Sequence, residues 1–163
     1  MKILSMKTTI FLGAMLSLLV CLMFTGCSNS ETNSTSRGLT DFAHNEEEYL
    51  ATIDSLNWPD GIALPDKLED EDTGASFQVG YGETRASYLW EYSWMKEWLD
   101  TYNTDPERAE KALEELEKAF DMPYMGIDRC DDATRNYLRE NIDKAKLGDP
   151  SGFTESIRAN YAN

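Results

Sequence analysis

Three tryptophans, Trp90, Trp94 and Trp98, recur at intervals of four residues. On an α-helix this spacing places side chains on one face, so the three indoles would form a stripe. An exposed stripe of indoles can stack on sugar rings or anchor a protein partner. We therefore take these residues, together with Trp58, as candidate ligand-binding residues. The alternative is that Trp58 and the apolar residues after it fold over the stripe, which would then belong to the core.

An acidic run precedes Gly74 and resembles half of a calcium-binding loop. Its members are Glu69, Asp70, Glu71 and Asp72. Counted from Asp70, the sixth position is Ala75 and the twelfth is Tyr81, where such a loop requires glycine and glutamate. The match fails, so we expect a solvated acidic loop and keep the four carboxylates only as weak candidates for a non-standard metal site.

Residues for the common catalytic mechanisms are scarce. His44 is the single histidine, and it stands near the start of the predicted domain, where it favours neither a Ser-His-Asp nor a Cys-His arrangement. The chain also lacks the residues of a usual zinc site and the pattern of a phosphate-binding loop. Carboxylate pairs that hydrolyse glycosides can be drawn from any chain with 30 acidic residues. We therefore expect a non-enzymatic protein without a cofactor.

The N-terminus has the pattern of a secretory signal. Lys2 and Lys7 precede an apolar stretch from Ile10 to Phe24, which is shorter than the roughly 20 residues of a membrane-spanning helix. The stretch ends in Leu22-Met23-Phe24-Thr25-Gly26-Cys27, which resembles the lipobox of bacterial lipoprotein precursors. Phe24 is a less usual residue at its position. The resemblance covers residues 1–27 and carries no information about the rest of the chain.

The resemblance implies that residues 1–26 are a signal peptide and that Cys27 becomes a mature N-terminus carrying a thioether-linked diacylglycerol. Two acyl chains would hold the protein to the membrane, on the extracytoplasmic face of the cell membrane or at the outer membrane of a diderm cell. An ordinary secretory signal is the alternative, and Met6 offers a second start. No later apolar run is long enough to span a membrane, so none is expected in the mature protein.

Residues 27–40 are mostly polar and predict a flexible tether, which leaves 41–163 as one acidic domain. With Cys21 removed and Cys27 lipidated, Cys130 has no disulfide partner. We expect it to be a small buried residue rather than a reactive thiol, since the neighbouring aspartates disfavour the thiolate.

The charge excludes one class of partner. The chain has 30 acidic and 15 basic residues, a net charge of −15, and loss of Lys2 and Lys7 would leave −17. A field of this sign repels the phosphates of nucleic acids and of anionic lipids. We therefore expect no nucleic-acid partner, while a basic partner or a divalent cation would be attracted.

Caps and periodicity predict helices along most of the domain. Asp105-Pro106 marks one start and Pro123 its end, whereas Gly148 ends the next helix. The predicted helices are about 45–56, about 84–102, 106 to before 123, 131 or 132 to before 148, and 150 onward. In the helix over 84–102 we expect the core face to comprise Tyr88, Tyr92, Met95, Leu99 and Tyr102. The opposite, solvated side would carry Ser93, Lys96, Glu97 and Asp100.

Together these patterns predict a mainly α, single small domain of four to five helices, with an extended Pro/Gly-turned segment packed on the aromatic helix. The alternative is an α+β domain in which residues 62–64 and 77–81 pair as a hairpin. The function we expect is a lipid-anchored, non-enzymatic interaction module whose partner is an envelope protein. The alternative is a ligand-binding lipoprotein that presents the tryptophan stripe and acidic residues to a glycan or divalent cation.

Overall fold

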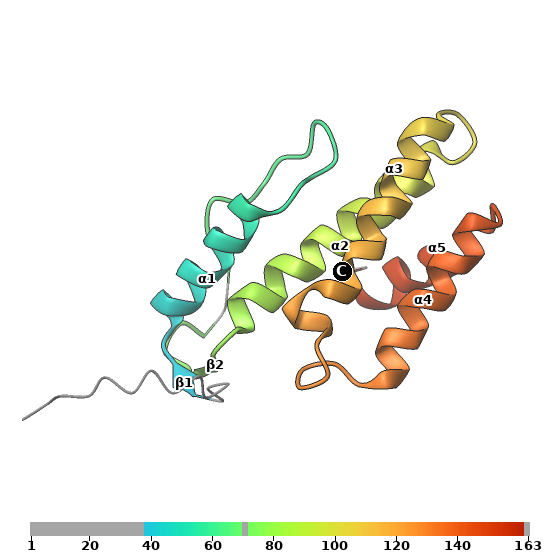
Figure 1. Cartoon of the computed structure of the whole chain (residues 1–163). Coiled ribbons are helices and arrows are strands. Elements are labelled where there is room, and N and C mark those ends of the chain that lie inside the picture. The colour runs from blue at the N-terminus through green and yellow to red at the C-terminus, as the bar shows by residue number, and fades with distance from the viewer. Residues whose placement is uncertain (1–37, 70–71, 162–163) are drawn as a thin grey trace, which may run out of the picture. The chain divides into compact units, whose positions relative to one another are not determined.

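The computed structural model describes residues 38–69 and 72–161, which form a mainly helical fold with one small antiparallel sheet (Figure 1). Cys27, most of the predicted tether, Asp70 and Glu71 lie outside the described residues. The elements in chain order are β1 (Leu39–Thr40), α1 (Phe42–Ser55), β2 (Phe77–Gln78), α2 (Tyr81–Thr101), α3 (Pro106–Glu117), η1 (Lys118–Asp121), η2 (Pro123–Met125), α4 (Asp132–Lys146) and α5 (Ser151–Asn160). The mainly α fold class is confirmed. Within the described part of the chain, no helix is long and apolar enough to cross a membrane.

Aspartate caps begin three of the helices. Asp41, Asp105 and Asp131 each accept a hydrogen bond from the backbone N–H three residues later. Such a bond satisfies one of the donors that the first helical turn leaves free. Because Asp41 provides the cap, α1 begins three residues earlier than predicted. Helix α2 also begins three residues early, at Tyr81, whereas α3, α4 and α5 begin within one residue of their predicted starts.

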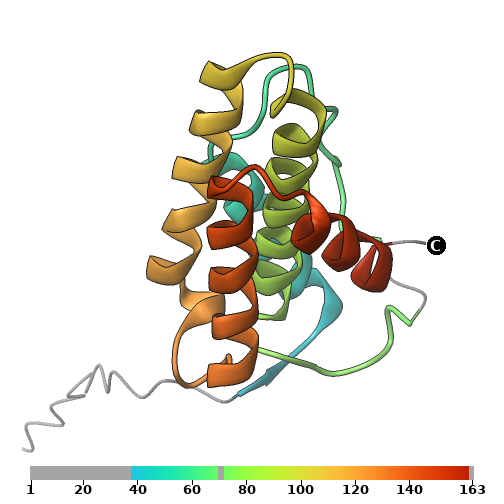
Figure 2. The same cartoon turned by 90° about the vertical axis from the view of Figure 1, so that its right-hand side faces the viewer.

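Helix α2 is the centre of the fold, because α1, α3, α5 and η2 all pack on it (Figures 1 and 2). The main core cluster includes Trp90, Trp94, Met95, Leu116 and Phe153. A smaller cluster joins α1 to α2 and contains Tyr49, Ile53, Leu68 and Ala86. The fold thus buries α2 around much of its circumference.

This arrangement corrects the predicted faces of α2. Ser93, expected in solvent, is buried and donates its hydroxyl hydrogen to the Leu89 carbonyl oxygen. Tyr88, expected in the core, is 42% exposed. The prediction was wrong because neighbours lie on several sides of α2, so the most apolar arc is not the only face that is covered.

The sheet pairs β1 with β2, with Leu39 opposite Gln78 and Thr40 opposite Phe77. The predicted strand near residue 77 is therefore confirmed, but its expected partner, residues 62–64, was wrong. The Val79 N–H also donates to the Gly38 carbonyl oxygen at 3.0 Å. Residues 38–40 consequently belong to the folded domain and not to the tether, which corrects the predicted boundary at residue 41.

The backbones of α1 and α2 approach closely at Gly82. A methyl group there would lie 2.0 Å from the Asn45 carbonyl oxygen and 2.9 Å from the Tyr49 nitrogen. Both obstacles are main-chain atoms, so they cannot move aside as the end of a flexible side chain would. This close approach requires the absence of a side chain at residue 82.

We therefore expect Gly82→Ala to lower the free energy of unfolding by about 1–3 kcal/mol, the usual cost of overpacking a core. Urea denaturation of the two proteins measures the difference. The matched control is Gly74→Ala, whose new methyl would meet only the Asp72 carboxylate at 3.5 Å, an ordinary contact. Equal denaturation midpoints for wild type and Gly82→Ala would show that the helices do not meet as closely as described.

Candidate functional site

The predicted tryptophan stripe is part of the core. Trp90 and Trp94 are each 1% exposed and Trp98 is 2% exposed. Both Trp90 and Trp94 donate their indole N–H to the Asn57 carbonyl oxygen, at 2.8 and 3.1 Å. Buried indoles cannot stack on an external ligand, so the hypothesis of an exposed stripe is wrong for these three residues.

The alternative, a covered stripe, describes the structure better, although the cover differs from the expected one. Trp58 is half-buried against the core, and its indole N–H donates to the Ile53 carbonyl oxygen at 2.9 Å. Leu64, however, is 41% exposed. Much of the cover comes from α3, α4 and α5, as in the edge-to-face contact between Trp98 and Phe153 at 5.3 Å.

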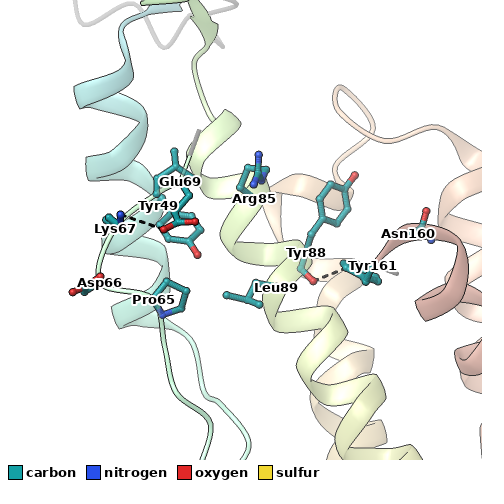
Figure 3. A pocket seen from close by; sticks show the side chains of 11 residues that line it. Tyr49, Pro65, Asp66, Lys67, Glu69, Arg85, Tyr88, Leu89, Asn160 and Tyr161 are labelled. Carbon is teal, nitrogen blue, oxygen red and sulfur yellow. Dashed lines mark hydrogen bonds and ion pairs between the residues drawn. The ribbon is translucent and has the colours of Figure 1, made fainter. Parts of the chain in front are cut away.

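A groove of about 680 Å³ lies on the side of α2 away from the tryptophan stripe. It is formed where α1, the segment 65–69 and the end of α5 meet α2 (Figure 3). We call it the α2 groove. Its lining residues are Tyr49, Pro65, Asp66, Lys67, Leu68, Glu69, Arg85, Tyr88, Leu89, Asn160 and Tyr161. The volume is in the range of typical ligand sites, about 300–1,000 Å³. The α2 groove is therefore the candidate functional site.

Part of the lining of the α2 groove is apolar and firmly held. Leu68 is buried against α1 and α2, and its backbone N–H donates to a Glu46 carboxylate oxygen at 3.3 Å. Tyr49 is 6% exposed and belongs to the same small cluster, and Leu89 packs at its edge. These contacts give the groove a preformed apolar surface.

Two cations face the groove, in different settings. Lys67 forms an ion pair with Glu69 at 3.2 Å, and both side chains are well exposed. Arg85 is exposed and donates one hydrogen bond, to the Tyr81 hydroxyl at 3.0 Å. Among the described residues, no carboxylate pairs with Arg85. Its positive charge opposes the rise in the pKa of Tyr49 that burial causes.

Tyrosines fix the end of α5 against α2. The Tyr161 ring packs on Tyr92 with 4.9 Å between centroids, and its hydroxyl donates to the Tyr88 carbonyl oxygen at 3.2 Å. The Tyr88 ring meets Tyr124 edge-to-face at 5.6 Å. The wall of the groove on the α5 side is therefore built from residues far apart in sequence, which sequence reasoning missed.

A buried carboxyl group lies behind this wall. Glu91 is 7% exposed and accepts a hydrogen bond from the Tyr124 hydroxyl at 2.7 Å. Burial raises the pKa of Glu91 to about 7, although the bond from Tyr124 acts in the opposite direction. Burial raises the pKa values of Tyr88 and Tyr161, and the charge on Glu91 adds to both increases. The signal that sequence reasoning missed was an acid one helical turn from both Tyr88 and Met95.

The other predicted site residues do not gather into a centre. Glu69 lines the α2 groove, whereas Asp70 and Glu71 fall outside the described residues. Within 38–69 and 72–161, no group of three or more His, Cys, Asp or Glu side chains is placed to hold a metal ion. Cys130 is half-buried against the core, and burial raises the pKa of its thiol.

Comparisons with known proteins add no assignment. No family model matches the chain, and no curated protein or solved structure matches it. The chemistry of the α2 groove is therefore inferred from its own geometry. The groove combines apolar side chains, tyrosine rings and an arginine whose N–H groups can donate to a carboxylate.

We expect Glu91→Gln to change how stability depends on pH. Below about pH 4.5, the folded and unfolded states both hold the proton on Glu91. Between about pH 4.5 and 7 only the folded state keeps it, so this residue lowers stability as the pH rises. The full cost is about 3 kcal/mol above pH 7. Glutamine carries no charge and keeps an acceptor for Tyr124, so the variant should gain stability over wild type at pH 8 but not at pH 4.

Thermal denaturation from pH 4 to 8 measures this difference. Glu114→Gln, at an exposed position on α3, is the control and should follow the wild-type profile. A constant difference between Glu91→Gln and wild type at every pH would contradict a raised pKa at Glu91.

Proposed function

We propose that this protein is a non-enzymatic interaction module, held at the extracytoplasmic face of the cell envelope by lipid on Cys27, and that it binds a partner protein in the α2 groove. One observation carries the proposal. Arg85 is exposed and lines the groove together with the apolar side chains of Pro65 and Leu89, and no carboxylate among the described residues pairs with it. The groove thus combines apolar and aromatic side chains with charged ones, and placed polar groups of this kind fix the orientation of a ligand in binding sites.

The lipid anchor and the charge support the same role. A lipid on Cys27 would hold the domain at the membrane without help from its surface. A net charge of −15 in the whole chain repels anionic headgroups. The domain would consequently stand away from the bilayer, with its groove open to proteins of the envelope.

The alternative function, a lipoprotein that binds a glycan or a divalent cation, has weaker support. Its glycan form relied on exposed indoles, and Trp90, Trp94 and Trp98 are buried. Its cation form relied on an acidic run whose two central residues lie outside the described part of the chain. We therefore prefer a protein partner.

Membrane fractionation tests the anchor. We expect the wild-type chain in the membrane fraction and Cys27→Ala in the soluble fraction, because the variant lacks the thiol that would carry the diacylglycerol. Cys130→Ala is the matched control and should stay with the membrane, since its thiol is half-buried in the domain. Membrane retention of Cys27→Ala after a high-salt wash would overturn lipid anchoring at this residue.

Photo-crosslinking in intact cells tests the groove. A photoreactive phenylalanine replaces Tyr88 in the groove or, as control, Tyr137 on α4; these tyrosines are 42% and 40% exposed. We expect a discrete crosslinked protein band from position 88 that position 137 does not give. Identical bands from both positions, or none from position 88, would contradict a partner in the α2 groove.

A further inference from the structure

We infer that the α2 groove binds an extended peptide segment in which a carboxylate lies beside an apolar side chain, with Arg85 as the anchor of the carboxylate. This inference rests on the proposed function, because it names the chemistry of the partner. It concerns the segment that enters the groove and not the whole partner protein.

Arg85 is positioned for such a contact before any ligand arrives. Its guanidinium donates to the Tyr81 hydroxyl at 3.0 Å and lies 5.8 Å from the centre of the same ring. A guanidinium has five N–H donors, and pairs of them match the two oxygens of a carboxylate. This hydrogen bond to Tyr81 leaves other guanidinium donors for a ligand, while Tyr81 restrains the side chain and lowers the entropy lost on binding.

The surrounding charge selects for one carboxylate rather than for many. Residues 28–107 contain 18 acidic residues and 4 basic ones, and two of those four, Lys67 and Arg85, line the groove. Lys67 is paired with Glu69, so Arg85 is the cation that remains for a ligand. A polyanion would meet the acidic surface beyond Arg85, whereas a segment with a single carboxylate among apolar residues would not.

The apolar part of the lining favours a peptide over a glycan. Sugar rings stack on free aromatic faces, but Tyr161 packs on Tyr92 and Tyr49 is 6% exposed. The Tyr88 ring is partly engaged by Tyr124. The aliphatic side chains of Pro65 and Leu89 complete the accessible surface, since Leu68 is buried, and Figure 3 shows Pro65 and Leu89 on opposite walls. Such a surface suits aliphatic or aromatic side chains of a peptide.

Selection from a phage-displayed library of random octapeptides tests the inference. The target is the full-length protein in detergent micelles, as wild type, Arg85→Gln or Lys96→Gln. Lys96 is the matched control, because it is an exposed cation on the same helix that pairs with Asp100 away from the groove. Melting temperatures of the three proteins confirm that each is folded.

We expect wild type and Lys96→Gln to enrich peptides with Asp or Glu beside an apolar residue, and Arg85→Gln to lose that enrichment. Replacing the acid of an enriched peptide by its amide should weaken binding to wild type by about tenfold or more, the scale of a charge-assisted hydrogen bond. The inference would be overturned if wild type enriched no such peptides or if Arg85→Gln enriched them equally. It would also be overturned if wild type bound glycans on an array but bound no peptides.

The two proposals fail in different ways. If position 88 gives a crosslink but the selection yields no acidic peptides, the proposed protein partner stands and the inferred carboxylate-containing segment is contradicted. Acidic peptides that depend on Arg85, without a crosslink in cells, would establish the binding chemistry and contradict a protein partner in the envelope.

Discussion

The Asn57 carbonyl oxygen accepts two indole N–H groups, from Trp90 and Trp94, and the rest of the fold depends on this pairing. A buried indole N–H without an acceptor costs free energy, so burial of Trp90 and Trp94 requires the chain just after α1 to lie against α2. Farther along the chain, Leu68 enters the α1–α2 cluster. Helices α1 and α2, joined at Asn57, therefore also line the α2 groove, through Tyr49 and Arg85.

The α2 groove lies where α1 and α5, which both pack on α2, do not meet. Helix α1 approaches so closely at Gly82 that a side chain would not fit, and α5 ends against α2 through Tyr161. Between them α2 presents Arg85, Tyr88 and Leu89, one helical turn of side chains without a covering helix (Figure 3). The walls are held by core packing, so the groove is preformed, which reduces the cost of ordering on binding.

Local signals predicted the helices, and tertiary contacts decided the rest. Caps such as Asp105 act within one turn, so helix starts could be read from the sequence. The buried face of α2 could not be predicted, because tyrosines and tryptophans are similarly apolar. Which of them are buried depends on the elements that pack on several sides of α2. Strand β1 has two residues and its Leu39 is 76% exposed, so the sequence has no alternating apolar pattern that predicts this strand. The groove was also beyond prediction, since its residues span positions 49 to 161.

An acidic protein that anchors a carboxylate through Arg85 is consistent with the range over which charges act. Interactions between exposed charges are largely screened beyond about 8 Å at physiological ionic strength. A carboxylate in contact with Arg85 therefore responds mainly to that guanidinium, whereas the further charges of a polyanion would each lie near other acids of the domain. Under the proposed function, the acidic surface and Arg85 would act together: the surface would repel nucleic acid and anionic lipid, and Arg85 would retain a segment that carries one acid among apolar side chains.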